Sequence, residues 1–199
     1  AGLKLRGKVS KVAKETLEMT VESVEVLAAP AVQLYLVQAL AKGDRDELAI
    51  QACTELGVYG VIPWQSDRSV SIWKEEKKIK GQARWQTIVS EAAKQSLRPF
   101  APTVESVQTS QEIASRLSLF DLVLVLDPLA PTSISQASIP STGSVAIVVG
   151  PEGGISDSEL DAFAVAGFTA VRLGSGVLRT STAGMAAVSY LQAKLGDWN

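Results

Sequence analysis

The 199-residue sequence contains no histidine and one cysteine, Cys53. Without histidine, the chain lacks the usual general base near neutral pH and the commonest metal ligand in proteins. Histidine-based catalytic triads and zinc sites are therefore excluded, and we expect no metal. A lone cysteine cannot form an intrachain disulfide, which suits a reducing compartment.

Long apolar runs and a large excess of charge are also missing. The longest apolar segments are far below the length that spans a bilayer, and no cationic, apolar leader is visible, so we expect a cytoplasmic protein with no membrane partner. Lys and Arg total 19 against 21 Asp and Glu, so any nucleic-acid footprint must be a local patch. No Gly-x-x-x-x-Gly-Lys-Ser/Thr run occurs, which excludes a P-loop NTPase.

The most informative segment is 145–159. Five apolar residues, 145–149, predict a strand buried on both faces, as in a parallel sheet covered by helices. The strand ends in the turn Gly150-Pro151-Glu152-Gly153-Gly154. Ser156 and Glu159 then have the spacing of a capping box, which predicts the start of a helix.

A second apolar run, 170–173, leads into another glycine-bearing turn and a helix predicted from about 181 to 195. Two glycine turns at consecutive strand ends leave backbone groups open to a ligand that approaches the main chain closely. Either turn alone could be an ordinary tight turn. Together, with Glu152 and Arg179 embedded in them, they favour a binding site.

The remaining chain alternates strand and helix signals, which is typical of an α/β fold. Strands are predicted at 32–40, 58–63, 104–107 and 122–126, helices at 45–56, 83–97 and 110–117, and a surface loop at 129–143. The first of these helices is expected to be capped by Asp44 and to bury Leu48, Ala52 and Leu56. Ser110 is expected to cap the third.

Residues 1–27 alternate loosely between apolar and polar side chains, which predicts antiparallel strands. Two or three strands do not make a stable domain alone. We therefore expect 1–28 to be the last part of a small β-domain and 29–199 to form the main domain. Lys4 and Arg6 belong to a basic stretch that could meet RNA phosphates, although a solvated strand face explains it equally well.

Two motifs together carry a resemblance to a known family. The run GPEGG followed by S-x-x-E, and L-G-x-x-x-L-R-x-x-T-A at 173–183, resemble the signature of the RsmE family, SPOUT-superfamily enzymes that methylate N3 of a uridine in 16S rRNA. Further matches lie at 39–45, 54–58, 63–69 and 91–98. The resemblance covers about 15–195. It departs after Arg179, where Thr180-Ser181-Thr182 replaces a segment that is more often acidic.

The resemblance implies a SPOUT-type parallel sheet with helices on both faces, a C-terminal trefoil knot and, at 1–28, the last strands of a PUA-like RNA-binding domain. It also implies S-adenosyl-L-methionine as the cofactor, 16S rRNA in the small ribosomal subunit as the substrate, and a homodimer. The cofactor would lie against three turns, formed by Leu126, Asp127, Pro128, Val149, Gly150, Pro151, Gly153, Gly154, Leu173, Gly174, Ser175, Val177, Leu178, Thr182 and Ala183.

Methylating N3 of uridine requires its proton to leave while negative charge spreads to the neighbouring carbonyl oxygens. Arg179 and Arg98 are the candidates to receive that charge, because a guanidinium offers paired donors. Glu152 or Glu91 could accept the proton, although a carboxylate beside a helix N-terminus can be stabilised there without doing chemistry. RNA contacts are expected from Lys4, Arg6, Lys42, Arg45, Arg68, Gln95 and Arg98.

Two other functions remain open. The chain could be a related SPOUT enzyme that acts on another RNA, or a non-catalytic RNA-binding module that keeps the fold without methyl transfer. Binding of the cofactor discriminates the module from an enzyme, because a degenerate glycine cradle would not bind it. Only the substrate can discriminate between two enzymes of this kind.

Overall fold

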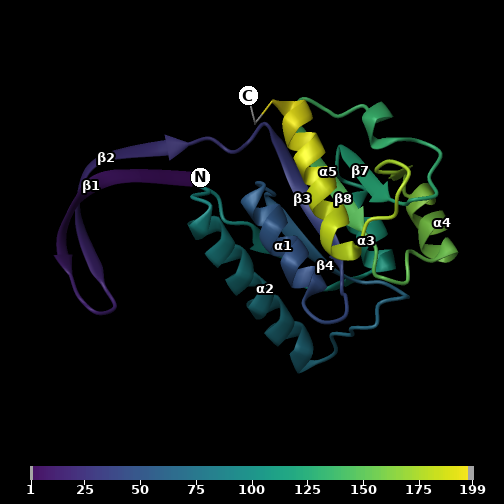
Figure 1. The fold of residues 1–199 in the computed structure, drawn as a ribbon, viewed down its shortest axis with the longest axis horizontal. Coiled ribbons are helices and arrows are strands. Elements are labelled where there is room, and N and C mark those ends of the chain that lie inside the picture. The colour runs from purple at the N-terminus through teal and green to yellow at the C-terminus, as the bar shows by residue number, and fades with distance from the viewer. Residues whose placement is uncertain (1, 197–199) are drawn as a thin grey trace. The chain divides into compact units, whose positions relative to one another are not determined.

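The protein is described here by a computed structural model that defines residues 2–196. The chain divides into two compact units, 1–30 and 31–199, and each is described by itself. The ribbon is shown in Figure 1. No helix within 2–196 is long and apolar enough to cross a membrane.

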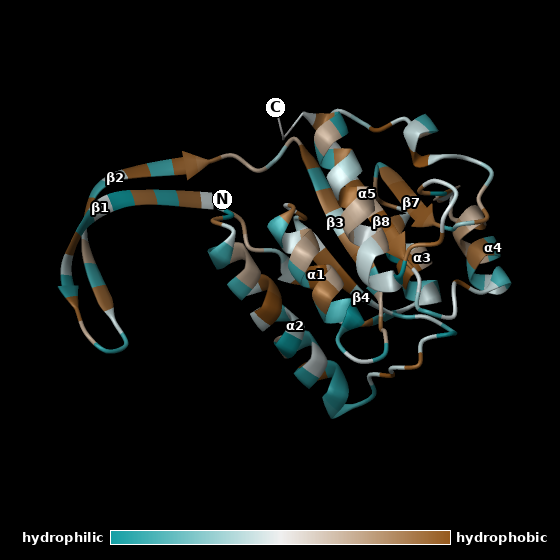
Figure 2. Ribbon diagram, in the orientation of Figure 1, coloured by the Kyte–Doolittle hydropathy of each residue, from teal (hydrophilic) through white to brown (hydrophobic). Residues whose placement is uncertain are grey.

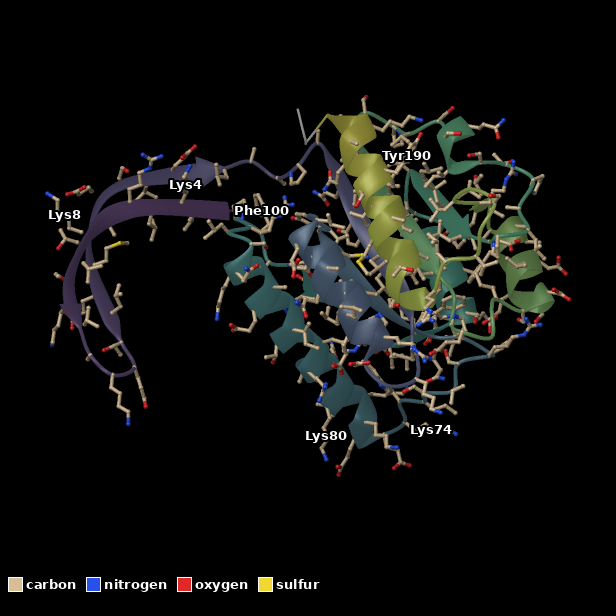
Figure 3. All side chains as sticks on the ribbon, viewed as in Figure 1. Lys4, Lys8, Lys74, Lys80, Phe100 and Tyr190 are labelled. Carbon is tan, nitrogen blue, oxygen red and sulfur yellow. The ribbon has the colours of Figure 1, made fainter. Side chains whose placement is uncertain are left out.

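The first unit is an antiparallel hairpin, which confirms the strands predicted at 1–27. Strand β1 (Gly2–Val12) pairs with β2 (Leu17–Leu27). Apolar and polar residues alternate along both strands (Figure 2), and large apolar side chains such as Leu3, Val24 and Val26 are more than half exposed. Lys4 lies 3.7 Å from Glu25 across the hairpin and points away from the ribbon (Figure 3).

The second unit is built on a parallel sheet, as predicted from the alternation of strands and helices. Its strands follow the order β5-β4-β3-β8-β7-β9, and β6 also pairs with β4. The strands are β3 (Val32–Ala39), β4 (Gly60–Gln65), β5 (Thr103–Val104), β6 (Gln108–Thr109), β7 (Leu122–Leu126), β8 (Gly143–Val149) and β9 (Thr169–Val171). The central strands are continuous apolar runs because both of their faces are covered.

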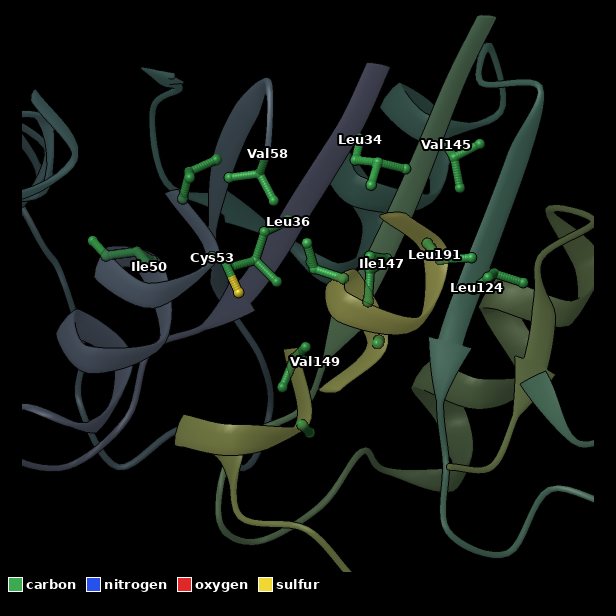
Figure 4. Packing of buried hydrophobic residues seen from close by; sticks show 14 of the residues in the cluster. Leu34, Leu36, Ile50, Cys53, Val58, Leu124, Val145, Ile147, Val149 and Leu191 are labelled. Atoms are coloured by element: carbon green, nitrogen blue, oxygen red, sulfur yellow. The ribbon is translucent and has the colours of Figure 1, made fainter. Parts of the chain in front are cut away.

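Helices cover both faces of the sheet, which confirms the predicted architecture. They are α1 (Arg45–Glu55), α2 (Glu76–Gln95), α3 (Ser110–Leu117), α4 (Asp157–Val165) and α5 (Thr180–Leu195). Successive strand residues point to opposite faces, so Ile147 packs in the cluster that contains residues of α1, α2 and α5, whereas Val148 packs with residues of α3 and α4. Figure 4 shows part of the cluster that contains Ile147.

Helix α5 lies close to the sheet and to α1 because its inner face is small. A Cβ atom added to Gly184 would lie 3.1 Å from Leu36 Cδ1 and 3.3 Å from Cys53 Sγ, so the backbone approaches strand β3 and α1 more closely than a larger residue allows. Ala183 and Ala187 are also buried in this cluster. The small residues of α5 therefore have a packing role within the chain.

The predicted inward face of α1 was wrong at Leu48, whereas Ala52 and Leu56 are partly buried and Leu56 packs against the core. Leu48 is half exposed, while Ala49, Ile50 and Cys53 are buried. Asp44 occupies the N-cap position but makes no capping hydrogen bond through its side chain. Two stripes along α1 both have helical spacing. The predicted stripe is Leu48, Ala52 and Leu56, and the observed stripe is Ala49, Ile50 and Cys53. The packing of α1 against α5 and the sheet selects the second.

Three further predictions are corrected in detail. Helix α2 begins at Glu76, so much of the charged segment expected before 83 is helical. The capping residue of α3 is Thr109, whose side chain accepts from the Glu112 N–H; Ser110 instead donates to Glu159. The loop at 129–143 includes a short 3₁₀ helix, Ile134–Gln136, in which Ile134 is buried.

Candidate functional site

The carboxyl ends of β7, β8 and β9 form one pocket, as expected for an open parallel sheet. The pocket has a volume of about 600 Å³, which suits a small organic ligand. The predicted residues that line it are Leu126, Asp127, Pro128, Val149, Gly150, Pro151, Glu152, Gly154, Leu173, Val177, Leu178, Arg179 and Ala183. The structure thus brings the two glycine turns and the end of β7 together.

Four residues expected to contact a cofactor do not line this pocket: Gly153, Gly174, Ser175 and Thr182. Gly153 has a packing role, because an added Cβ would lie 3.2 Å from the Cβ of Arg68. Gly174 has a φ of +95° and forms the turn itself. The Thr182 hydroxyl donates to the Arg179 carbonyl over 3.2 Å.

Several lining residues were not assigned to the cofactor from the sequence. They are Leu129, Ile155, Asp157, Leu160, Val171, Gly176 and Thr180, together with Arg45 and Arg68, which were expected to contact RNA. Most of these residues adjoin a motif residue in the sequence, so proximity to the motifs was a usable signal. Arg45 is the first residue of α1, and Arg68 lies in the loop after β4; only the fold places them here.

The first glycine turn has a shape that requires its glycines. A Cβ atom at Gly150 would lie 2.7 Å from Ile155 Cγ1, a distance that Cβ atoms do not adopt without a shift. Gly154 has a φ of +74°, in the left-handed region that favours glycine. The main chain therefore lies directly at the pocket wall, with its N–H and C=O groups close to any ligand.

The predicted capping box at the start of α4 is confirmed. Ser156 Oγ accepts from the Glu159 N–H, and Glu159 accepts from the Ser156 N–H over 2.8 Å. Glu159 is buried and also accepts from the Asp67 N–H at 2.9 Å and from Ser110 Oγ at 2.6 Å. One carboxylate thus joins the glycine turn to the loop after β4 and to α3.

Glu152 connects the glycine turn to the loop after β3. Its Oε1 accepts from the Lys42 N–H over 3.1 Å and from Arg45 Nη1 over 2.7 Å. Burial raises the pKa of the Glu152 carboxyl, but the hydrogen bonds from Arg45 and from backbone N–H groups lower it more, so the pKa lies below its usual value. The carboxylate is therefore ionised, and its contacts favour a positioning role over proton transfer.

Three guanidinium groups line the pocket: those of Arg45, Arg68 and Arg179. Arg68 Nη1 donates to the carbonyls of Gly153 and Ile155, at 3.2 and 3.3 Å. Arg179 is the N-cap residue of α5. Within 2–196 its guanidinium makes no ion pair or hydrogen bond.

Arg98 lies outside the pocket of its own chain. Its Nε and Nη2 atoms donate to the Glu55 carbonyl over 2.9 and 2.6 Å, and a Cβ on Gly57 would lie 2.9 Å from its Nη1. A cation at this position satisfies a carbonyl at the end of α1 and complements the helix dipole. Gln95 is exposed and also does not line the pocket. Lys42 contributes its backbone N–H to Glu152.

Comparisons with known proteins identify the class that this fold and pocket define. A family model described as RNA methyltransferase domain matches 28–192. A crystal structure of a ribosomal RNA small subunit methyltransferase E from Neisseria gonorrhoeae bound to S-adenosyl methionine is similar, with a TM-score of 0.88 and 28% identity over 100% of this chain and 81% of that chain. The class is thus that of α/β RNA methyltransferase domains.

Two curated relatives are also similar. The ribosomal RNA small subunit methyltransferase E of Bacillus subtilis is 34% identical over 91% of this chain and 72% of its own length. That of Mycobacterium bovis is 40% identical over 82% of this chain. The chain belongs to the family of ribosomal RNA small subunit methyltransferase E. It spans 64% of the length of the Mycobacterium bovis relative.

Proposed function

We propose that the protein is an S-adenosyl-L-methionine-dependent methyltransferase that modifies N3 of a specific uridine in 16S rRNA. The observation that carries this proposal is the pocket in which two glycine turns, after β8 and before α5, meet the end of β7. The similar Neisseria gonorrhoeae enzyme has S-adenosyl methionine bound, which supports the same cofactor here.

The residues of the pocket fit this cofactor. Leu126, Leu160 and Leu173 offer apolar surface to an adenine ring, while the glycine turns offer backbone donors and acceptors to its polar edge and to the ribose. The cofactor would supply the methyl group on a positively charged sulfur. The chain then needs to bind it, orient the target base and stabilise the charge that develops on that base.

Arg179 is the candidate to stabilise that charge. Its guanidinium lines the pocket and, within 2–196, makes no ion pair and no hydrogen bond. Negative charge on the uracil oxygens would be met by fixed, paired donors. Arg98 is a weaker candidate because its donors are engaged by the Glu55 carbonyl. We assign Glu152 a positioning role toward Arg45 and leave the general base open, with Glu91 as one exposed carboxylate.

The RNA partner and the assembly are part of the same proposal. The names of the relatives support rRNA of the small ribosomal subunit as the substrate, and a cytoplasmic location is part of this proposal. Lys4 and Arg6 of a PUA-like domain, and Arg45 and Arg68 at the pocket, are the proposed phosphate contacts. A homodimer and a C-terminal trefoil knot follow from the family resemblance and remain predictions.

The test begins with a calorimetric titration of S-adenosylhomocysteine into the chain, at a concentration that keeps any dimer assembled. We expect saturable binding near one molecule per chain. Methyl transfer is then measured on unmodified small subunits and on free 16S rRNA, with the product nucleoside identified by mass spectrometry. A folded chain that binds no cofactor would contradict the enzyme proposal and favour an RNA-binding module; a different product would indicate another RNA target.

A further inference from the structure

A chain of two hydrogen bonds, one buried and one partly buried, connects the core to the pocket wall. Gln38 Nε2 donates to Thr180 Oγ1 over 2.9 Å, and Thr180 Oγ1 donates to the Gly150 carbonyl over 2.8 Å. Gln38 is fully buried at the end of β3, and Thr180 is 6% exposed. These bonds therefore join three segments that are far apart in the sequence: the central strand, the first glycine turn and the start of α5.

The direction of each hydrogen bond is determined by chemistry. The Gly150 carbonyl can only accept, so the single hydroxyl proton of Thr180 must be donated to it. The Thr180 oxygen can then only accept from its other neighbour, which requires the amide nitrogen of Gln38, and not its oxygen, to face it. The side chains of Gln38 and Thr180 thus act as one oriented unit.

The orientation leaves a polar atom without a partner. Within the described chain, Gln38 Oε1 is buried and has no hydrogen-bond partner. Leaving a buried acceptor unpaired is unfavourable for folding, and an apolar side chain of similar shape would avoid that cost. The amide nitrogen, in contrast, donates both to Thr180 Oγ1 and, over 3.3 Å, to the Ala39 carbonyl, so the donor side of Gln38 accounts for a glutamine at this position.

We propose that Gln38 is a positioning residue for the proposed methyl transfer. Through Thr180, it holds the two glycine turns that line the pocket at one separation, with the Gly150 carbonyl engaged by the Thr180 hydroxyl. Thr180 and Gly150 both line the pocket, so loss of the connection changes the ligand cradle and not only the core. This inference rests on the proposed function.

The test compares the dissociation constant of S-adenosylhomocysteine for four variants: Gln38→Met, Thr180→Val, the double variant and Thr180→Ser. We expect each of the first two to weaken binding about tenfold, the worth of roughly one hydrogen bond. The double variant should be no more than about threefold weaker than either single variant, because both remove the same connection. Thr180→Ser retains the hydroxyl and should bind within about threefold of wild type.

Two matched controls separate positioning from general destabilisation. Thr54 is buried, and its hydroxyl donates to the Ile50 carbonyl over 2.7 Å; Gln192 is buried, and its amide donates to the Leu56 carbonyl over 2.9 Å. Neither residue lines the pocket. Thr54→Val and Gln192→Met each lose buried hydrogen bonding and should lower the urea midpoint at least as much as Thr180→Val does, while binding stays within about twofold of wild type.

The outcomes distinguish this inference from the proposed function. A folded wild-type chain that binds no S-adenosylhomocysteine would overturn both. If the wild-type chain binds and both Gln38→Met and Thr180→Val bind equally well, the inference alone is overturned. The same holds if the losses of affinity of the two single variants multiply in the double variant. If Gln38→Met does not fold, Thr180→Val against Thr180→Ser decides it, because threonine and valine have nearly the same shape.

Discussion

At the scale of single residues, the site depends on how each charged group is held. Glu152 accepts from the Lys42 N–H and from Arg45 at the start of α1. Arg98 donates to a carbonyl at the end of α1, and the Arg179 guanidinium makes no hydrogen bond or ion pair within 2–196. The three residues that the sequence suggested for catalysis therefore have different surroundings, which lead to different predictions.

Arg179→Ala is expected to lower the turnover number by about 10²-fold, because it removes donors to the charge that develops on the base. Binding of S-adenosylhomocysteine should stay within about threefold of wild type. Single-turnover methyl transfer and calorimetry measure the two quantities, and Arg116→Ala, on α3, serves as the control. If Arg179→Ala turns over as fast as wild type, Arg179 takes no part in catalysis.

Glu152→Gln keeps an oxygen that can accept from Lys42 and Arg45 but removes the negative charge. If Glu152 positions Arg45, turnover should fall by less than about tenfold. A general base replaced in this way would lose roughly 10²- to 10⁴-fold. A loss of roughly 10²- to 10⁴-fold, with a matching change in the pH–rate profile, would indicate that Glu152 acts as the general base.

Asp46 provides a pH-dependent contribution to stability. Its carboxylate is 4% exposed and accepts from the Ala41 and Glu47 N–H groups at 2.9 and 2.8 Å. Burial is the main cause that raises its pKa from 3.8 to about 6. Between these values the folded chain binds more protons than the unfolded chain, so the free energy of unfolding falls as the pH rises.

Relative to Asp46→Asn, the wild-type free energy of unfolding should fall by roughly 1–3 kcal/mol between pH 4 and pH 7. Urea denaturation of both proteins at one-unit intervals measures the difference, and titration of all other groups cancels in the comparison. A difference that does not change with pH would show that Asp46 is charged in the folded protein throughout this range.

At the scale of elements, the start of α4 sets the shape of the first glycine turn. The sequence predicted the capping box of Ser156 and Glu159 correctly because all of its contacts are local. The inward face of α1 was not predictable in the same way, because Leu48 and Ile50 have similar hydropathy and only the neighbouring helix and sheet decide which is buried. Local patterns define where a helix begins more surely than which side it buries.

Ser156→Ala should reduce the free energy of unfolding by about 1 kcal/mol, since it removes the cap of α4 and a partner of Glu159. Ser118→Ala is a matched control, because the Ser118 hydroxyl is exposed and donates to the Ser115 carbonyl at the end of α3. Urea denaturation of both variants tests this. Equal, negligible effects would show that the cap adds little to stability.

At the scale of the whole molecule, the two units differ in how much of their surface is buried. The strands of the hairpin expose large apolar side chains such as Leu3 and Val26, whereas Leu36 in β3 and Ile147 in β8 are fully buried. A two-stranded sheet without a covered face is marginally stable. The hairpin should therefore open far more often than the parallel sheet.

Hydrogen exchange followed by mass spectrometry is expected to show this difference. Amides of β1 and β2 should exchange at least about 10³-fold faster than those of β3 and β8, because they open without disturbing the main core. Peptides from α3 and α5 provide internal references of intermediate protection. Equal protection of the hairpin and the sheet would show that the hairpin is stabilised by a further contact.

The sequence by itself determined the fold class, most strand and helix positions, and the two glycine turns, because these depend on periodicity and local turn chemistry. Only the tertiary structure decided that Arg45 and Arg68 line the pocket and that Gln38 holds Thr180. Gln38 and Thr180 are 142 residues apart, and such pairings arise from the order of strands in the sheet. One-dimensional spacing contains no signal for a contact of that kind.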